Sequence, residues 1–325
     1  MKIFISTAPF GEVDPRPRDI LEENGFSYCV NPFGRKMRSD EIGDIISDYE
    51  ILIAGTERID RTILDQAGKL KLIVRVGIGL DSVDLLAARA KNIAVSYTPD
   101  APSAAVSELA VGLMLNLMRS IHVSDRELHQ GRWQRRFGER IGNSTVGVIG
   151  AGRIGSRVVQ HLLGFDCPRI LVSDPDPNVI LPDSNTVERC DLGTVLQESD
   201  LVTIHVPLSN ATRNLISDQE LRAMKDTAYL LNTSRGGIVD ERALFEGLKG
   251  GVIAGAAVDT FDHEPYQGRL QELDNCFLTA HMGSMSKDCR SRMEIEATEE
   301  AIRFCRGEPL EQSVPEEEYG IQDGR

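Results

Sequence analysis

The feature that most constrains this chain is a cluster of glycines in the stretch VGVIGAGRIGSRV, residues 146–158. Glycine weakens both strands and helices, so its concentration beside an apolar run indicates that a ligand approaches the backbone closely. Gly150, Gly152 and Gly155 form the pattern G-x-G-x-x-G between a strand-like segment and a helical one. In that setting the three glycines allow a tight turn, an approach of backbone N–H groups to a pyrophosphate, and close helix–strand packing. The stretch predicts a dinucleotide site, with ordinary structural turns as the alternative.

A carboxylate lies at the spacing that such a site requires. The next strand-like segment, RILVSD, ends at Asp174, about twenty residues beyond the glycines, where an acidic side chain binds the adenosine ribose. A carboxylate there would repel a 2′-phosphate, which favours NAD over NADP as the cofactor. The alternative is that Asp174 only begins the turn DPDP, a common use of Asp-Pro.

Short β-branched runs alternate with helical patterns, first up to Ser96 and again from Thr145 with six strand candidates. This alternation predicts an α/β chain with two doubly wound parallel-sheet domains. We expect a substrate domain over 1–98 plus 287–325 and a dinucleotide-binding domain over 99–286.

The joints between these domains have their own signals. The prolines of YTPDAPS mark the first hinge, and Ser103 is expected to cap the long helical pattern that follows. A final helix at about 287–306 is expected to pack back on the first domain. The acidic tail PEEEYGIQDGR has little to bury and is expected to fray.

Charge and composition exclude several classes of partner. The net charge is −14, from 36 basic and 50 acidic side chains, which disfavours nucleic acid and anionic membranes. We expect no membrane span, because no stretch approaches about 18 consecutive apolar residues. The six cysteines are scattered without a C-x-x-C pair, which favours a reducing, cytoplasmic location and argues against a zinc or other metal site.

Three ionisable residues each follow a strand candidate in the second half of the chain. They are Arg235 in LLNTSRGGIVD, Glu264 in AVDTFDHEP and His281 in LTAHMGS. Ligands of open α/β sheets bind beyond the carboxyl ends of the strands, so we expect the three side chains to converge on the nicotinamide end of a dinucleotide. Each residue also has an ordinary alternative, in a turn, a surface loop or a structural histidine.

Together these segments resemble the D-isomer-specific 2-hydroxyacid dehydrogenase family, and most of all its phosphoglycerate dehydrogenase branch. The similar segments are RVGIGLDSVD, ELAVGLML, GVIGAGRIGSRV, HVPLSNATRNLIS, NTSRGGIVDE, VDTFDHEP and TAHMGS. The resemblance implies a flavodoxin-like substrate domain, a Rossmann NAD-binding domain, and a catalytic set of Arg235, Glu264 and His281. It further implies NAD contacts from the following residues: Arg153, Ile154, Thr233 and Asp259.

The resemblance also implies an assembly and a domain content. Family members commonly dimerise through the region after the long linking helix, so Trp133 in GRWQRR is a candidate contact in a homodimer, with ordinary packing as the alternative. Because the chain ends soon after the final helix, we expect a short form without the regulatory C-terminal domain of many phosphoglycerate dehydrogenases. Ala280 stands where the family often has proline.

The residue types suit the reaction that the family catalyses, which is reduction of a 2-oxo acid or oxidation of a D-2-hydroxy acid. His281 is expected to be the general acid and base. Glu264 would orient the imidazole and favour its charged form. Arg235 would bind the substrate carboxylate in a bidentate manner that lysine reproduces poorly.

The first domain is expected to supply the other part of the substrate site. The loop RVGIGLD places Gly77, Ile78 and Gly79 after a strand, where backbone N–H groups can hold a carboxylate, with Arg75 nearby. A plain glycine turn is the alternative. The basic cluster of Arg35, Lys36 and Arg38 is either a phosphate contact for a phosphoglycerate-like substrate or a solvated face.

A different class of function remains open. NAD-sensing corepressors are built on the same fold and keep the same three catalytic residue types, so an NAD-sensing binding protein is the alternative to an enzyme. A short-chain reductase is excluded because no Tyr-x-x-x-Lys pair occurs in the chain.

Overall fold

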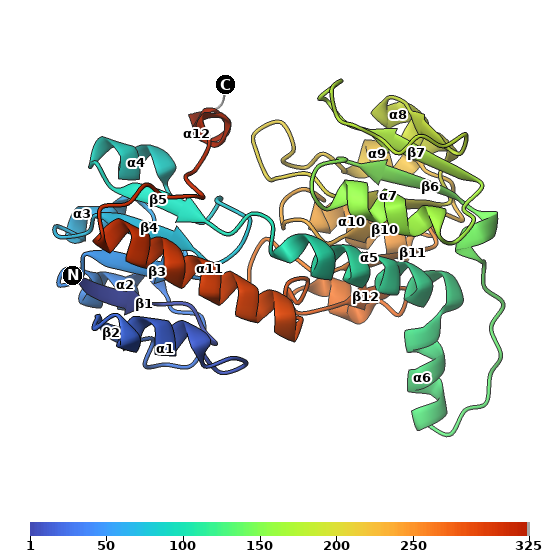
Figure 1. Ribbon diagram of the computed structural model, residues 1–325. Helices are drawn as coiled ribbons and strands as arrows, with labels where there is room; N and C mark the ends of the chain where they lie inside the picture. Colours follow the sequence, from blue (N-terminus) through green and yellow to red (C-terminus); the bar gives the residue numbers. More distant parts are fainter. Residues whose placement is uncertain (324–325) are drawn as a thin grey trace. The chain divides into compact units, whose positions relative to one another are not determined.

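Two parallel sheets organise the computed structural model, which describes residues 1–323 (Figure 1). Contacts within the chain divide it into two units. The first unit comprises Met1–Pro102 together with the chain from Ser284 onward, and the second comprises Ser103–Gly283. Two doubly wound units on one chain confirm the predicted fold class.

The first unit is a five-stranded sheet in the order β2-β1-β3-β4-β5, and every neighbouring pair is parallel. This is the strand order of flavodoxin-like folds. Its strands are β1 (Lys2–Ile5), β2 (Ser27–Val30), β3 (Ile51–Ala54), β4 (Leu72–Arg75) and β5 (Ala94–Tyr97). Its helices are α1 (Arg16–Glu23), α2 (Ser39–Ile46), α3 (Arg61–Gln66), α4 (Leu85–Ala90), α11 (Lys287–Cys305) and α12 (Glu316–Asp323).

The central strands β3 and β4 are buried on both faces, since successive side chains point to opposite sides and all are buried, whereas the edge strand β2 is partly exposed. Phe4, Leu52 and Ile73 share one cluster with apolar side chains of α2, α3 and α4. The long helix α11 contacts β3, β4 and β5, and Figure 1 shows it lying across the strands. Each fully buried aliphatic side chain of such a core contributes roughly 1.5–3 kcal/mol to folding.

The second unit is a seven-stranded parallel sheet in the order β12-β11-β10-β9-β6-β7-β8. Its strands are β6 (Thr145–Ile149), β7 (Arg169–Ser173), β8 (Val187–Arg189), β9 (Leu201–Ile204), β10 (Tyr229–Asn232), β11 (Gly255–Val258) and β12 (Cys276–Leu278). Its helices are α5 (Pro102–Arg119), α6 (Ile121–His129), α7 (Gly155–Leu163), α8 (Leu192–Glu198), α9 (Asp218–Ala223) and α10 (Glu241–Lys249), with short 3-10 turns η1 (Ile141–Asn143) and η2 (Arg269–Glu272). The strand order reverses between β6 and β9, which is the switch point where a Rossmann fold binds its dinucleotide.

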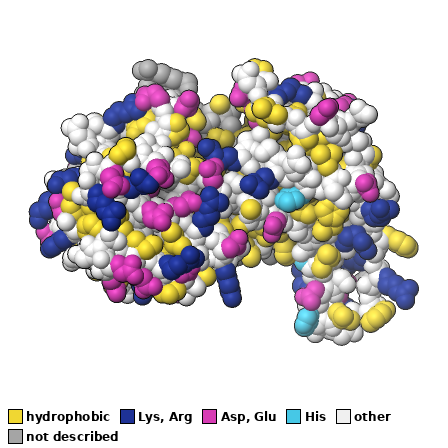
Figure 2. Space-filling view, in the orientation of Figure 1, with side chains coloured by type: hydrophobic (Ala, Val, Ile, Leu, Met, Phe, Trp, Pro, Cys, Tyr) yellow, Lys and Arg dark blue, Asp and Glu magenta, His cyan; other side chains and the backbone are white. Residues whose placement is uncertain are grey.

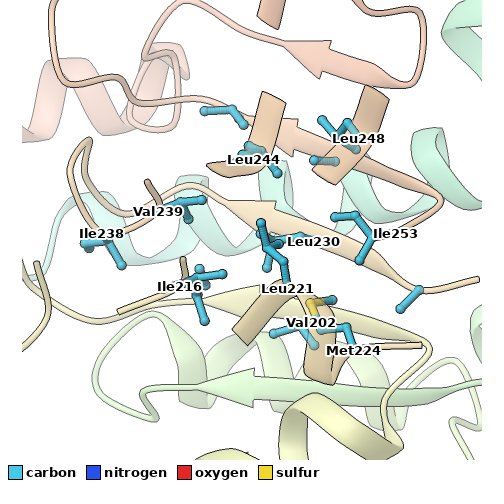
Figure 3. Close-up of a cluster of buried hydrophobic side chains, with 14 of the residues drawn as sticks. Val202, Ile216, Leu221, Met224, Leu230, Ile238, Val239, Leu244, Leu248 and Ile253 are labelled. Carbon is cyan, nitrogen blue, oxygen red and sulfur yellow. The ribbon is translucent and has the colours of Figure 1, made fainter. Parts of the chain in front are cut away.

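Two hydrophobic clusters cover the faces of this sheet. One joins apolar side chains of α5 and α7 to β6 and β7. The other joins α8, α9 and α10 to β9 and β10, and Figure 3 shows Val202, Leu230, Leu221 and Leu244 meeting within it. Burial on both faces explains why the strand segments read as nearly continuous apolar runs.

Several local expectations were wrong. The second sheet has a seventh strand, β8, at its edge. The long helical pattern is interrupted at Ser120, whose φ of 49° is left-handed, so that α5 and α6 are separate helices. Helix α5 begins at Pro102, which places Ser103 inside the helix, where its hydroxyl is buried without a hydrogen-bond partner among the described residues and caps nothing.

The end of the chain also differs from expectation. Most of the tail that was expected to fray forms α12, whose Tyr319 packs against the apolar cluster of the first unit, while its last two residues lie outside the described part of the chain. Within residues 1–323, no single helix is long and apolar enough to cross a membrane. Only α5 and α6 taken together reach that length and composition, with a bend of 65° between them.

Candidate active site

The glycine loop of the second unit lies at the switch point, between β6 and α7. Gly150 has a φ of 87°, and a Cβ there would lie 2.6 Å from the His205 carbonyl oxygen, which follows β9. A Cβ on Gly155 would lie 1.9 Å from the Gly150 carbonyl oxygen. Around Gly152 no atom of the described residues, apart from its neighbours in the chain, would lie within 4 Å of an added Cβ. Two glycines therefore allow close packing, and the third leaves open space where a ligand can approach.

Asp174, directly after β7, is bonded to this loop. Its Oδ2 accepts the Ala151 N–H at 2.6 Å, and its Oδ1 accepts the Asp176 N–H at 2.9 Å. The carboxylate thus both starts the turn after β7 and faces the glycine loop. Ile154 directly precedes α7 and makes no capping hydrogen bond, and Arg153 is exposed beside it.

The loop after β10 positions Arg235 through a buried asparagine. Asn232 is 2% exposed; its Oδ1 accepts the Ser234 N–H at 3.0 Å and its Nδ2 donates to the Arg235 carbonyl at 2.9 Å. A Cβ on Gly236 would lie 2.0 Å from the Phe261 carbonyl carbon. The loop that bears Arg235 therefore lies directly against the loop after β11, and this close approach leaves room only for glycine at position 236.

That second loop contains Glu264, which binds the histidine. The Nδ1 atom of His281 lies 2.9 Å from both carboxylate oxygens of Glu264. Both side chains are partly exposed, at 28% for His281 and 21% for Glu264. Since Nδ1 is occupied by the carboxylate, Nε2 is the ring nitrogen available for a reacting group.

The backbone around His281 is held by Asp259, which is fully buried. His281 has a left-handed φ of 48°, and its N–H donates to the Asp259 carbonyl at 2.8 Å. The Asp259 carboxylate accepts hydrogen bonds from the Thr279 hydroxyl at 2.6 Å, the Met282 N–H at 2.9 Å and the Gly283 N–H at 3.0 Å. Asp259 therefore fixes the strained turn that presents the imidazole.

A sequence profile described as "D-isomer specific 2-hydroxyacid dehydrogenase, NAD binding domain" matches residues 111–283. Hydroxypyruvate reductase of Thermotoga maritima is 35% identical over 274 residues, which are 82% of this chain and 88% of that protein. The chain belongs to the D-isomer specific 2-hydroxyacid dehydrogenase family. It is therefore an NAD-dependent oxidoreductase of the hydroxyacid class.

Two further proteins are similar to this chain over most of its length. D-3-phosphoglycerate dehydrogenase of Methanocaldococcus jannaschii is 36% identical over 321 residues, which are 94% of this chain but 60% of that longer protein. The crystal structure of the TT0316 protein from Thermus thermophilus has a TM-score of 0.88 at 31% identity and covers 97% of this chain and 100% of that one.

The described residues fit the dinucleotide that the family binds. The open space at Gly152 suits a pyrophosphate against the backbone. Thr233, which follows β10, is 6% exposed, and its hydroxyl has no hydrogen-bond partner among residues 1–323. A buried hydroxyl that lacks a partner is expected where a ligand supplies one. No group of three or more His, Cys, Asp or Glu side chains suited to a metal ion occurs in the same residues.

Burial shifts the pKa values of two side chains near the loops of the candidate active site. Burial lowers the pKa of His205 to about 3, so this side chain is neutral, with its Nε2 2.9 Å from the Thr203 hydroxyl. Burial raises the pKa of Glu241, whose Oε1 accepts the Asp262 N–H at 2.8 Å. Both groups support loops that follow strands of the second sheet.

The candidate substrate residues of the first unit lie at the end of β4. Arg75 is buried, and its guanidinium donates to the Val76 carbonyl. Gly77 has a φ of 139°, and its N–H donates to the Thr98 hydroxyl at 2.7 Å. An N–H that already has an acceptor is not the one that holds a carboxylate, so Ile78 and Gly79 are the remaining donors of the predicted loop.

Sequence reasoning missed the residues that position the predicted ones. Asn232, Gly236 and Thr279 are neither ionisable nor part of the glycine pattern, so chemistry alone did not single them out. The signal that could have found Asn232 is its place at the end of a buried strand, where a polar side chain must find partners in the next turn.

Proposed function

We propose that this dehydrogenase interconverts a short, unphosphorylated 2-oxo acid and its D-2-hydroxy acid, with Arg235, Glu264 and His281 as the catalytic set. The observation that supports this most directly is the contact of His281 Nδ1 with both oxygens of Glu264, at 2.9 Å each. A histidine held by a carboxylate at one nitrogen and partly exposed is suited to deliver a proton from the other.

Each residue then has one role. When bound, NADH supplies the hydride that the carbonyl carbon of the substrate accepts. His281 gives its Nε2 proton to the carbonyl oxygen, and takes it back in the oxidative direction. Glu264 holds the ring and stabilises its positive charge. Arg235, placed by Asn232 and Gly236, binds the substrate carboxylate.

The cofactor preferred is NAD rather than NADP. The Asp174 carboxylate lies at the glycine loop, bonded to the Ala151 N–H at 2.6 Å, in the position from which it binds ribose hydroxyls and repels a 2′-phosphate. We assign the NAD contacts to the glycine loop with Arg153 and Ile154, to Asp174, and to Thr233. Asp259, being fully buried, supports this site through the His281 turn.

For the substrate carboxylate we propose the loop after β4 as a second contact. Ile78 and Gly79 would donate their N–H groups, while Gly77 and Arg75 shape the loop beneath them.

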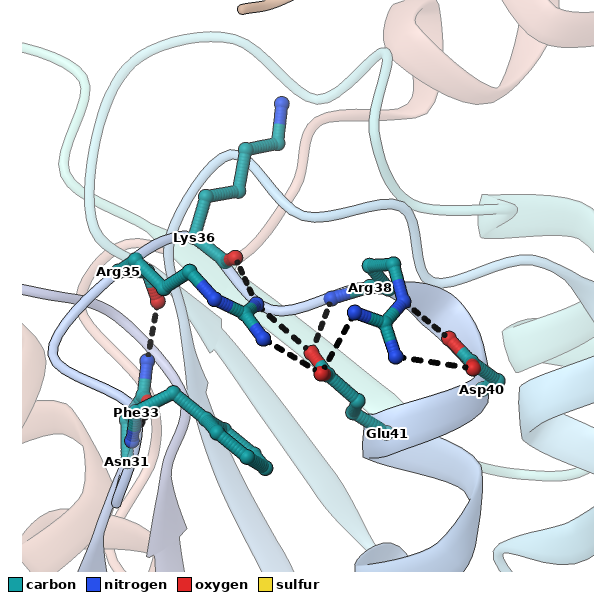
Figure 4. A network of polar contacts seen from close by, with 7 residues as sticks. All are labelled: Asn31, Phe33, Arg35, Lys36, Arg38, Asp40 and Glu41. Carbon is teal, nitrogen blue, oxygen red and sulfur yellow. Dashed lines mark hydrogen bonds and ion pairs between the residues drawn. The ribbon is translucent and has the colours of Figure 1, made fainter.

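The phosphoglycerate-like alternative needs local positive charge, and the two arginines of the basic cluster near α2 are already paired, whereas the Lys36 ammonium points away from them (Figure 4). The Arg35 guanidinium donates to both Glu41 oxygens at 2.9 and 2.6 Å, and Arg38 forms ion pairs with Asp40 and Glu41 (Figure 4). Those arginines hold the pKa of Glu41 at about 2. A phosphate would have to displace these carboxylates, so we favour a substrate without one.

An assembly and a location complete the proposal. Exposed apolar side chains gather on α6 and the segment after it, where Figure 2 shows hydrophobic surface, and they include Leu128 at 55%, Trp133 at 80% and Phe137 at 107% exposure. Such a patch is typical of a protein interface, and we propose a homodimer formed through it.

All six cysteines are free thiols, which supports a cytoplasmic location.

The test is NADH oxidation with a panel of 2-oxo acids, comparing the wild type with His281→Ala. We expect turnover by the wild type and a loss of about 10²–10⁴-fold in kcat for the variant, with NADH binding retained. His263→Ala, an exposed histidine in the same pair of loops, is the matched control and should keep its activity.

The result also separates an enzyme from a sensor. Full activity in His281→Ala would contradict the catalytic set. Tight NADH binding by a wild type that turns over no 2-oxo acid would instead support the NAD-sensing, corepressor-like alternative, which the enzymatic relatives do not favour.

A further inference from the structure

The C-terminal helix α12 is fastened to the first unit at its start. Arg89, on α4, donates to both carboxylate oxygens of Glu316 at 2.8 and 2.7 Å. The same guanidinium lies 3.4 Å from the centre of the Tyr319 ring. Tyr319 in turn packs against the apolar cluster of α2, α3 and α4. These contacts place α12 against α4, the helix that follows the candidate substrate loop.

In the last turn of α12, the Gln322 side chain binds three backbone groups of the first unit. Gln322 accepts the Leu85 N–H at its Oε1, at 2.9 Å. Its Nε2 donates to the Val83 carbonyl at 2.8 Å and to the Leu80 carbonyl at 3.2 Å. A glutamine amide offers one acceptor atom and two N–H donors, so this single group satisfies three backbone groups of one turn.

Those backbone groups belong to the turn between the candidate substrate loop and α4. The Leu85 N–H is in the first turn of α4, where a helix leaves its N–H groups without internal partners. On its other side the turn is held by Ile59, whose N–H donates to the Ser82 carbonyl at 2.7 Å and whose carbonyl accepts from the Asp84 N–H at 2.9 Å. The turn is therefore held between Ile59 and Gln322, and it begins at the residue after Gly79.

We propose that Gln322 is a positioning residue for substrate binding: by fixing the Leu80–Leu85 turn it holds the N–H groups of Ile78 and Gly79 in the geometry that binds a carboxylate. This inference rests on the proposed role of that loop. It gives the C-terminal helix a part in setting the affinity for the substrate, and none in binding NADH or in proton transfer.

The experiment compares the wild type with Gln322→Ala in two measurements. Amide hydrogen exchange at Leu85, whose N–H is bonded to the glutamine, should become about five- to tenfold faster, as expected for the loss of one such hydrogen bond. The KM for the 2-oxo acid should rise about three- to tenfold, with kcat and the Kd for NADH within about twofold.

Two further variants sharpen the result. Gln322→Glu keeps the size and one acceptor but places a carboxylate against two carbonyl oxygens, so its KM should rise at least as far as in Gln322→Ala. Arg89→Ala weakens the docking of α12 while Gln322 is intact, and should give a smaller rise of about twofold, because exposed ion pairs contribute little. Glu317→Ala, at an exposed position of the same helix, is the control and should behave as the wild type.

The outcomes distinguish this inference from the proposed function. Unchanged exchange at Leu85 in Gln322→Ala, or faster exchange with an unchanged KM, would overturn the positioning role while the enzyme remains a 2-oxo acid reductase. Absence of turnover by the wild type with every 2-oxo acid would instead overturn the proposed function. Loss of kcat with KM unchanged would also contradict the inference, because it would place the effect on the chemical step.

Discussion

Two glycine-containing loops, one in each unit, follow a strand of a parallel sheet and are held in place by different means. The loop of Gly150–Gly155 is held by close backbone packing, since a Cβ on Gly155 would lie 1.9 Å from the Gly150 carbonyl oxygen, and by the nearby Asp174 carboxylate, which accepts the Ala151 N–H at 2.6 Å. The loop of Gly77–Gly79 is held by residues distant in sequence: the Thr98 hydroxyl accepts the Gly77 N–H at 2.7 Å, the Thr98 N–H donates to the Gly77 carbonyl at 3.2 Å, and Gln322 binds the turn that follows.

The difference teaches which kind of site can be read from a short motif. A loop fixed by its own glycines and a carboxylate after the next strand depends on a short stretch of sequence, so the motif predicts its geometry. A loop fixed by side chains distant in sequence depends on the whole unit, and Gln322 lies 237 positions from the Leu85 N–H that it accepts. The first arrangement suits a cofactor whose pyrophosphate is the same in every reaction. In the second, residues elsewhere in the first unit can change the geometry of the candidate substrate loop.

The largest effect is expected for Gly155→Ala. The added methyl group must displace the Gly150 carbonyl, which should weaken NADH binding by about a hundredfold or more and lower the stability of the second unit. NADH fluorescence titration and thermal unfolding measure the two effects. Gly112→Ala on α5, where an added Cβ meets no described atom within 4 Å, is the control and should leave both unchanged. A Gly155→Ala protein with normal NADH affinity would show that packing does not hold this loop.

A smaller effect, confined to the other loop, is expected for Gly77→Ala. The φ of 139° is strained for alanine, and its Cβ would lie 2.7 Å from the Arg75 guanidinium. We expect the KM for the 2-oxo acid to rise about tenfold while the Kd for NADH stays the same. Gly68→Ala, with open space around it, is the matched control in the same unit. An equal loss of NADH affinity would remove the distinction between the two loops.

The smallest effect concerns acid stability, which should differ between the units because all six histidines lie within Ser103–Gly283. Burial lowers the pKa of His205 to about 3, below its ordinary value of about 6.5. Stability from the neutral ring is therefore present above pH 6.5 and is lost as the pH falls toward 3, by at most about 1.4 kcal/mol per pH unit.

Calorimetry between pH 7 and pH 5 tests this assignment. The thermal midpoint of the wild type should fall by a few degrees, and the fall should be smaller in His205→Asn. His129→Asn, at an exposed position, should follow the wild type. Identical pH profiles for the wild type and His205→Asn would show that the acid sensitivity has another source.

The sequence predicted the parts of the molecule whose patterns are local. Both sheets, the strands of the first unit and the helix α11 follow from alternation of apolar runs and helical periodicity. The strand β8 was missed because Val187–Arg189 is short and only partly buried, so it lacks an apolar signal. The break at Ser120 was missed because the apolar periodicity continues across it.

The same distinction applies to the candidate site. Arg235, Glu264 and His281 are predicted from their chemistry and their place after strands, whereas the contacts that hold them depend on packing between loops. Asn232 and Asp259 show this, because each uses its polar atoms on backbone groups that only the folded chain brings near. The tail was misread because its apolar contacts are few, and its docking depends on Arg89 and Gln322.

Helix α11 has a consequence for how the protein is made. It packs on the sheet of the first unit and its Arg290 donates to the Thr7 hydroxyl at 2.9 Å, yet it leaves the ribosome only after the whole second unit has been synthesised. We expect one apolar face of the N-terminal sheet to stay exposed during synthesis, where chaperones can bind it. Chains stalled before α11 should then be more sensitive to protease than chains stalled after it. The part of the protein that is translated first is thus the last to be completed.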